Sequence, residues 1–228
     1  MVRKRSPESS TRIEATFCFI DLAGFTALTE AQGDEDAADV AMRFAELTRG
    51  VLEPGDRLVK TIGDAVLVTS PSASSGVALV ERLLNVTAAE ARHPELRAGL
   101  HYGGAVERDG DVFGAAVNLA ARVAAEAYPG EVLGTDPIAI AARGQGIPVA
   151  ELGSVLLKNV KDSVALYSLA LVLGVTDAAI DPVCQVSIDR RGAAGRLQYR
   201  GNEYWFCSLT CAAAFASNPG WHVKATSR

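Results

Sequence analysis

Strand-like and helix-like segments alternate along most of this 228-residue chain, and the alternation limits the folds open to it. Apolar or alternating runs bounded by turn residues predict single strands at 15–20, 96–106, 131–135, 149–157 and 164–171, and two strands within 57–68. Apolar residues at helical spacing predict helices beginning near Thr26 and at 34–52, 76–91, 115–122 and 136–144. Because strands and helices follow one another, with hairpins among them, we expect α/β layers around a mixed sheet.

The two ends of the chain depart from this pattern. Residues 1–12 are polar and basic without periodicity, which predicts a disordered tail. Residues 172–180 form a short linker, and three of the four cysteines follow it. The fourth, Cys18, lies alone in an apolar run, so we expect it to be a buried core residue rather than part of a disulfide framework.

Composition excludes some classes of partner. With 49% hydrophobic and 21% charged residues, the chain has the composition of a globular protein with a packed core. A formal net charge of −5 gives no bulk attraction to nucleic acid or to an anionic membrane, so a phosphate-binding site would have to be local. No apolar run is long enough for a membrane span or a signal region, and we expect a soluble, cytoplasmic chain without nucleic-acid or membrane partners.

The stretch from Asp111 to Arg122 combines a short strand, a glycine and an alanine-rich helix. Asn118 and Arg122 are four residues apart and therefore share one helical face. An amide can fix a sugar or a base by hydrogen bonds, and a guanidinium matches the geometry of phosphate. The pair suggests a nucleotide clamp, although an exposed polar pair on a surface helix is the simpler explanation when the pair is considered alone.

Two acids stand where strands end. Asp21 follows the strand 15–20, where it is either a metal ligand or the N-cap of the next helix. Asp64 lies at the tip of the hairpin 57–68, where Gly-Asp is also an ordinary turn sequence. Paired carboxylates beside a triphosphate are how proteins hold Mg²⁺. The backbone N–H groups of residues 24–26, at a helix start, would suit phosphate oxygens.

Three motifs together resemble the class III nucleotidyl cyclases. They are Phe19-Ile20-Asp21-Leu22-Ala23-Gly24-Phe25-Thr26, Lys60-Thr61-Ile62-Gly63-Asp64 and the stretch from Asp111 through Arg122. Leu157-Lys158-Asn159-Val160 with Tyr167-Ser168-Leu169 is similar to the family's closing hairpin, with Asn159 where glycine is common. The resemblance covers residues 13–171 and implies a ferredoxin-like cyclase fold: a mixed, mainly antiparallel sheet flanked by helices.

The resemblance also implies roles for single residues. Asp21 and Asp64, with Leu22, would hold two Mg²⁺ or Mn²⁺ ions; Lys60 and Asp111 would read adenine; Asn118 and Arg122 would stabilise the transition state; Gly24, Phe25, Thr26 and Lys158 would also bind substrate. A lysine donor and an aspartate acceptor match adenine rather than guanine, so ATP is the expected substrate. The family further implies a head-to-tail homodimer with two composite sites. The expected activity is that of an adenylate cyclase, and the alternative is a catalytically silent, nucleotide-binding sensor or scaffold.

Residues 181–226 resemble a YHS domain, a small treble-clef-like module. The resemblance rests on Asp181-Pro182-Val183-Cys184, the run Tyr199 to Cys211, and Asn218-Pro219. Cys184, Cys207 and Cys211, with His222 as a fourth ligand, would suit Zn²⁺ or Cu⁺. Gln185-Val186 stands where Gly-Met is usual, and Thr210 where His is frequent, so buried reduced thiols are the alternative. We expect the module to modulate the output of the cyclase domain.

Overall fold

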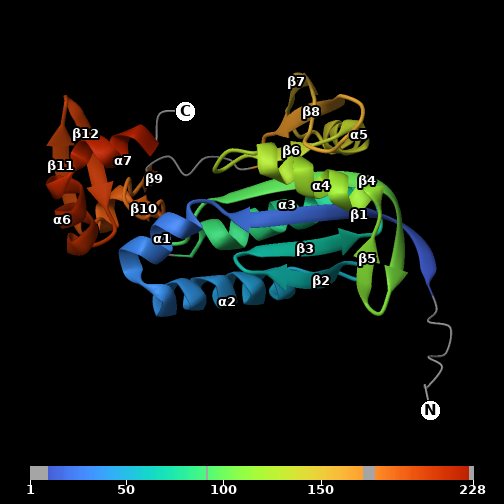
Figure 1. Ribbon diagram of the computed structural model, residues 1–228, viewed down its shortest axis with the longest axis horizontal. Coiled ribbons are helices and arrows are strands. Elements are labelled where there is room, and N and C mark those ends of the chain that lie inside the picture. The colour runs from blue at the N-terminus through green and yellow to red at the C-terminus, as the bar shows by residue number, and fades with distance from the viewer. Residues whose placement is uncertain (1–9, 91, 172–177, 226–228) are drawn as a thin grey trace, which may run out of the picture.

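The computed structural model describes residues 10–90, 92–171 and 178–225 (Figure 1). Its main sheet has eight strands, in the order β2-β3-β1-β4-β6-β8-β7, with β5 paired to β4. The strands are β1 (Thr11–Leu22), β2 (Arg57–Ile62), β3 (Ala65–Ser70), β4 (Leu96–Arg108), β5 (Asp111–Phe113), β6 (Val132–Gly134), β7 (Val149–Val155) and β8 (Val164–Leu169). The β4–β6 pair is parallel and the other neighbours are antiparallel, which confirms the mixed, mainly antiparallel sheet.

Strand β1 lies in the middle of the sheet, between β3 and β4. It starts at Thr11, so the expected tail is too long by its last residues, and residues 1–9 lie outside the described part of the chain. Along the strand, Phe17 packs in the cluster on one face while Cys18 and Ile20 pack on the other, and all three are fully buried. Cys18 is therefore the core residue that the sequence predicts.

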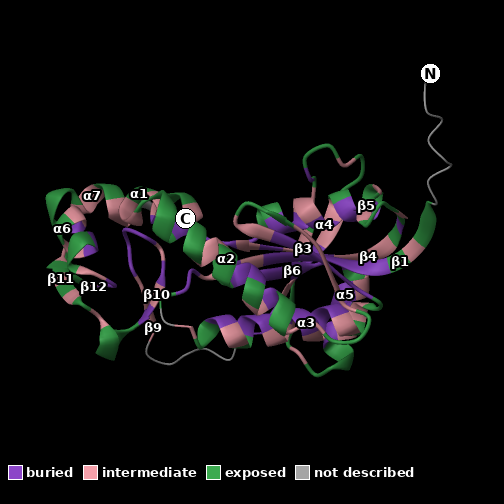
Figure 2. Ribbon diagram, turned by 90° about the horizontal axis from the view of Figure 1, so that it is seen from below, coloured by how far each residue is buried: buried purple, intermediate pink, exposed green. Residues whose placement is uncertain are grey.

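Helices cover both faces of this sheet (Figure 2). The helices α2 (Asp34–Gly50), α3 (Ala73–Ala88) and α5 (Asp136–Gly144) pack on the face that carries Ile20, and α4 (Ala115–Glu126) packs on the opposite face. Helix α3 begins earlier than the sequence suggests, because Ser72 and Ser75 form a reciprocal capping box in a segment that reads as a polar linker. The helix ends at Ala88, and His93 lies buried beyond it rather than at its end.

Helix α4 is pressed closely against strand β4. Gly99 makes this possible, because a Cβ atom built on it would lie only 2.0 Å from the backbone nitrogen of Ala124. No side chain can be accommodated at that separation, so the glycine lets the helix and the strand meet backbone to backbone. The position of α4 over the sheet is thereby fixed by main-chain contact.

The described residues of the C-terminal module form two hairpins, two α-helices and a short 3-10 helix, η1 (Arg190–Gly192). Its elements are β9 (Ala178–Ile180), β10 (Ser187–Asp189), β11 (Gly195–Tyr199), β12 (Asn202–Phe206), α6 (Leu209–Ser217) and α7 (Pro219–Ala225). It lies beside α1 (Phe25–Gln32), at one end of the main sheet (Figure 1). Leu28 of α1 is fully buried in the same apolar cluster as Phe206 and Phe215 of the module. The expected boundaries, 13–171 and 181–226, thus separate two parts that share a core. No helix in the described residues is long and apolar enough to cross a membrane.

Candidate functional site

The main sheet brings Asp21 and Asp64 together. Asp21 stands near the end of β1 opposite Ala65, the first residue of β3, and Asp64 occupies the turn just before that residue. The backbone N–H of Leu22 donates to the carbonyl of Asp64 at 3.4 Å. Partial burial and the nearby charge of Asp21 raise the pKa of Asp64 to about 6. The two carboxylates therefore lie close enough for Asp21 to affect the ionisation of Asp64.

Arg97 is the residue that sequence reasoning missed. Its Nε and Nη2 atoms both donate to Oδ2 of Asp21, at 2.8 and 2.5 Å. Asp21 and Arg97 face each other directly in the β1–β4 register. The guanidinium places a positive charge beside the two acids, where a cation or a phosphate group would be bound. The two residues are neighbours because of the strand register, and the spacing of the motifs in the sequence does not predict that register.

The two acids suit a divalent cation. Burial and a second carboxylate disfavour the ionised form of Asp64, as its raised pKa shows. A cation bound by both carboxylates would stabilise that ionised form. Carboxylate oxygens are also the ligands preferred by Mg²⁺ and Mn²⁺. The side chain of Leu22 is apolar and buried, so Leu22 can offer such an ion only its backbone carbonyl. The donor set fits the metals that the sequence analysis expects.

Next to the acids, the chain turns sharply into helix α1. Gly24 is the N-cap residue, with φ at +74°, a conformation that favours glycine. No side chain caps this helix and its first turn has no acidic residue, so the N–H groups of Phe25 and Thr26 at its start are not covered by a carboxylate. Free N–H groups and the helix dipole favour an anion there. The geometry suits phosphate oxygens beside Asp21.

Lys60 and Asp111 form a second group. Nζ of Lys60 on β2 lies 2.7 Å from Oδ2 of Asp111, the first residue of β5. The hydrogen bond from Lys60 lowers the pKa of Asp111, which is therefore ionised at neutral pH. The fold thus joins the two residues expected to read the base. No hydrogen bond or ion pair among the described residues links this group to Asp21 and Asp64.

Asn118 and Arg122 lie on helix α4, as the sequence predicts. Ala116, Val117 and Ala120 form the buried face of this helix, whereas Asn118 is exposed and Arg122 is partly exposed. Neither side chain has a hydrogen bond or an ion pair with any residue that the structure describes. Both polar groups are therefore available to a ligand or to a second chain.

Lys158 is exposed in the turn that follows β7. The next residue, Asn159, has φ at +62°, in the left-handed region. Asparagine is one of the few residues other than glycine that tolerate this conformation, so its presence where glycine is common has a physical reason. Lys158 has no hydrogen bond or ion pair with the three groups above or with any other residue that the structure describes.

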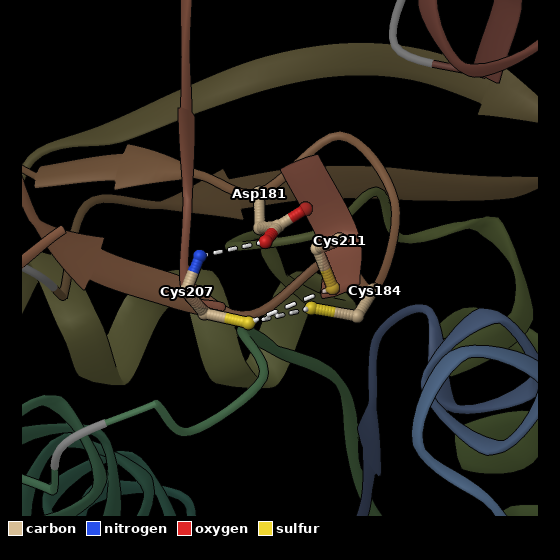
Figure 3. Close-up of side chains that lie close together, drawn as sticks. All are labelled: Asp181, Cys184, Cys207 and Cys211. Atoms are coloured by element: carbon tan, nitrogen blue, oxygen red, sulfur yellow. Dashed lines mark hydrogen bonds between the residues drawn. The ribbon is translucent and has the colours of Figure 1, made fainter. Parts of the chain in front are cut away.

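A further cluster lies in the C-terminal module (Figure 3). One ligand atom from each of Asp181, Cys184, Cys207 and Cys211 lies within 4.8 Å of the other three, and all four residues are buried. The sulfur atoms of Cys184 and Cys207 are 3.4 Å apart, and those of Cys207 and Cys211 are 3.8 Å apart. A disulfide would bring two sulfurs to about 2.05 Å, whereas thiolates at the corners of a zinc tetrahedron are about 3.8 Å apart. The spacing suits metal ligands.

Asp181, rather than His222, completes this cluster. Its carboxylate accepts the backbone N–H groups of Val183 and Cys207, each at 2.8 Å, which holds it beside the thiols. His222 instead stacks on the ring of Phe215, with the ring centroids 6.0 Å apart. Sequence reasoning noted Asp181 in its motif but did not count it as a ligand.

The thiols are electrostatically coupled. Hydrogen bonds from Cys184 and Cys207 lower the pKa of Cys211, and the hydrogen bond with Cys207 raises the pKa of Cys184. Cys211 also stands in the first turn of α6, where a helix dipole favours a negative charge. One thiolate among neutral thiols is a starting point for binding a soft cation.

Comparison with known proteins agrees with the fold of the main sheet. The family model of the adenylate and guanylate cyclase catalytic domain matches residues 8–170. A pH-sensitive adenylate cyclase of Mycobacterium tuberculosis is 36% identical over 158 residues, which are 68% of this chain and 40% of that protein. An adenylate cyclase of Streptomyces coelicolor is 37% identical over 116 residues, 50% of this chain and 30% of that protein. The chain thus spans less than half the length of these relatives.

Solved structures share the fold. The adenylyl cyclase CyaB of P. aeruginosa superposes with a TM-score of 0.62 at 23% identity, over 71% of this chain and 96% of that one. The family match ends at residue 170, before the C-terminal module. Through residues 8–170, this chain belongs to the adenylate and guanylate cyclase catalytic domain family.

Proposed function

We propose that this chain is an adenylate cyclase, which converts ATP into 3′,5′-cyclic AMP and diphosphate at a homodimer interface. One observation carries the proposal: the six expected residues are all present, and they lie in separate groups that each suit a different part of the nucleotide. Relatives named as adenylate cyclases support the choice of reaction.

Asp21, Asp64 and Arg97 would serve the triphosphate end. The carboxylates of Asp21 and Asp64 would hold two divalent ions, which would neutralise charge and lower the pKa of the attacking hydroxyl. The N-terminus of α1 would bind phosphate oxygens. The guanidinium of Arg97 would leave Asp21 and donate its hydrogen bonds to the triphosphate instead. Before substrate binds, the ion pair between Arg97 and Asp21 would hold both side chains in place.

Lys60 and Asp111 would serve the base. When adenine enters, Nζ of Lys60 donates to a ring nitrogen and the carboxylate of Asp111 accepts from the exocyclic amine. Guanine presents the opposite pattern at both positions, and a buried mismatch of donors costs more than the loss of one hydrogen bond. The preformed ion pair aligns the two side chains before the base binds.

Asn118 and Arg122 would act on the reacting atoms. The 3′ oxygen forms a bond to the α-phosphorus, the bond from that phosphorus to the bridging oxygen breaks, and the hydroxyl proton is released to water. Asn118 would orient the ribose, and Arg122 would neutralise the charge that develops on the phosphoryl oxygens. Neither side chain has a hydrogen bond or an ion pair with another described residue, so no such contact has to break for them to act.

A two-fold dimer would join the groups that a single chain keeps apart. Asp21 and Asp64 of one subunit would face Lys60, Asp111, Asn118 and Arg122 of the other, and symmetry would create two such sites. The exposed apolar side chains of Ile62 and Phe113, beside the first and second groups, are available for such an interface.

For the C-terminal module, we propose a bound soft cation, Zn²⁺ or Cu⁺, held by the three thiols and Asp181. The observation behind this is the spacing of the sulfur atoms in a buried cluster without a disulfide. The likeness of residues 181–226 to a YHS domain supports the same assignment.

The experiment that tests the enzymatic proposal is incubation of the purified chain with ATP or GTP and either Mg²⁺ or Mn²⁺, followed by separation of the products. Cyclic AMP from ATP, absent with the Asp21→Ala variant, is the expected result. Binding of ATP without cyclic product under all four conditions would contradict cyclase activity and favour the nucleotide-binding sensor.

A further inference from the structure

The C-terminal module contacts Gly24, at the start of α1, where the proposed function places phosphate oxygens. A Cβ atom built on Gly24 would lie 2.4 Å from Cβ and 2.8 Å from Cγ of Gln185, so the Gln185 side chain occupies the space that Gly24 leaves open. Gly24 is the N-cap of α1 and stands three residues after Asp21. A side chain of the module is thus in contact with the backbone that the proposed function assigns to the triphosphate.

Gln185 holds an unusual backbone conformation to make this contact. Its φ is +61°, in the left-handed region, where the Cβ of a residue other than glycine is sterically crowded. Its backbone N–H donates to the carbonyl of Asp181 at 2.9 Å, and its side-chain amide donates to the carbonyl of Pro182 at 3.1 Å. The turn from Asp181 to Gln185 therefore aims the side chain at Gly24 and holds it there.

The same turn carries two members of the cysteine cluster. Asp181 begins the turn and Cys184 immediately precedes Gln185. Anything that draws Asp181, Cys184, Cys207 and Cys211 around one centre would fix the turn at both ends. The side chain of Gln185, which contacts Gly24, therefore belongs to the same hydrogen-bonded turn as Asp181 and Cys184 of the cluster.

Helix α1 also contacts the module at its other end, this time through the cluster itself. The side-chain amide of Gln32 points to Sγ of Cys207, with nitrogen and sulfur 3.9 Å apart. Between the two contacts, Leu28 is buried in the core of the module. The module thus holds α1 at its start, middle and end.

From these contacts we propose that the cysteine cluster is a control site for the cyclase: a thiophilic cation bound there fixes Gln185 against Gly24 and keeps α1 in the arrangement that receives the triphosphate. The inference rests on the proposed function, because it concerns the affinity of the same site for ATP. The loaded module is the active form, and loss of the cation frees the turn, loosens α1 and weakens ATP binding. Gln185 is a positioning residue, since it acts through Gly24 and touches no substrate.

The test uses the full chain, kept reduced, with Zn²⁺ as the probe. The metal content of zinc-loaded and zinc-stripped protein is measured, followed by KM for ATP with Mg²⁺ and by amide hydrogen exchange of residues 24–32. Stripping is expected to raise KM by about fivefold or more, the lower end of typical coupling between sites, and to speed exchange in α1. The exchange measurement needs no turnover, so a failure of cyclase activity leaves it able to decide the coupling.

Three variants sharpen the result. Cys211→Ser is expected to lose zinc and to match the stripped protein. Gln185→Ala is expected to bind zinc as before while its KM and exchange no longer respond to it. Gln198→Ala changes an exposed glutamine of the same module on β11, and it is expected to respond as the unmodified chain does.

Three results would overturn the proposal. If no zinc binds, the cluster is a set of packed thiols without a control role. If zinc binds but neither KM nor the exchange of α1 changes, the cation serves only the stability of the module. If Gln185→Ala responds to zinc as strongly as Gln198→Ala, the contact with Gly24 does not transmit the effect.

Discussion

Arg97 and Asp21 form a two-point contact in which Nε and Nη2 of the guanidinium donate to the same carboxylate oxygen. This arginine thus forms an ion pair with one of the two aspartates that are proposed to hold the metals. Under the proposed function, Arg97 would compete with the cation for Asp21 before ATP binds and would bind phosphate once ATP is present.

Replacing Arg97 by glutamine should therefore have opposite effects on the two ligands. Binding of Mn²⁺ without nucleotide should tighten, while KM for ATP should rise by about tenfold or more, because a charge-assisted hydrogen bond is lost. Titration calorimetry with Mn²⁺ and initial rates with ATP measure the two effects. Arg196→Gln, which removes an exposed arginine paired with Glu203, is the control, and equal behaviour of the two variants would refute the assignment.

The raised pKa of Asp64 makes metal binding depend on pH. Its value in the folded protein is about 6, above its ordinary value of 3.8, so the metal-free fold gains stability from this group at low pH and loses it as pH rises through about 6. A cation needs the ionised form. The rise in melting temperature caused by Mn²⁺ should therefore be large at pH 7.5 and small at pH 5.

Asp64→Asn should abolish that difference between the two pH values, since the amide does not titrate in this range. Asp162→Asn, at an exposed aspartate, should preserve it. Stabilisation by Mn²⁺ that is equal at both pH values in the unmodified chain would show that Asp64 is not a ligand.

The ion pair between Lys60 and Asp111 predicts a change in the choice of nucleotide. Lys60→Glu with Asp111→Cys removes both hydrogen-bond patterns that suit adenine, so kcat/KM for ATP should fall and the ratio of GTP to ATP use should rise. Competition assays with both nucleotides measure the ratio. Arg57→Glu changes a neighbouring cation that pairs with Glu107 and should leave the ratio as it is. An unaltered preference for ATP in the double variant would mean that the two side chains do not read the base.

The separation of Asp21 from Arg122 in the proposed dimer predicts complementation. Asp21→Ala and Arg122→Ala proteins should each be nearly inactive, with Arg122→Ala reduced by roughly 10²–10³ in rate. After subunit exchange, half of the dimers are mixed and each has one intact site, so about a quarter of the original activity should return. Cyclic AMP formation is measured before and after exchange. Activity that stays at the level of the separate variants, despite demonstrated exchange, would place both residues in one chain's site.

The order and kind of elements up to residue 171 could be predicted from sequence, because strand alternation, turn residues and helical spacing are local properties. The hairpin at residues 57–70 and the helix that carries Asn118 follow from such patterns. The start of α3 did not, since its capping box uses Ser75 where a glutamate or glutamine is the usual signal.

Contacts between distant segments were beyond local patterns. The pairing of Arg97 with Asp21 depends on strand register, and a shift of one residue would have turned the guanidinium to the other face. Asp181 joins the cysteines only because its turn folds back on Cys207. Leu28 reads as an ordinary apolar residue of a short helix, yet it is buried in the core of a module that begins far along the chain.

The close contact at Gly99 has a consequence for how two such sites would work together. Strand β4, which carries Arg97 toward one site, and helix α4, which carries Asn118 and Arg122 toward the other, cannot slide past each other. In the proposed two-fold dimer, strand β4 and helix α4 would therefore form one rigid unit that contributes residues to both reaction centres. A displacement of helix α4 at one centre would therefore also displace strand β4 at the other, so nucleotide binding at the two centres would be coupled.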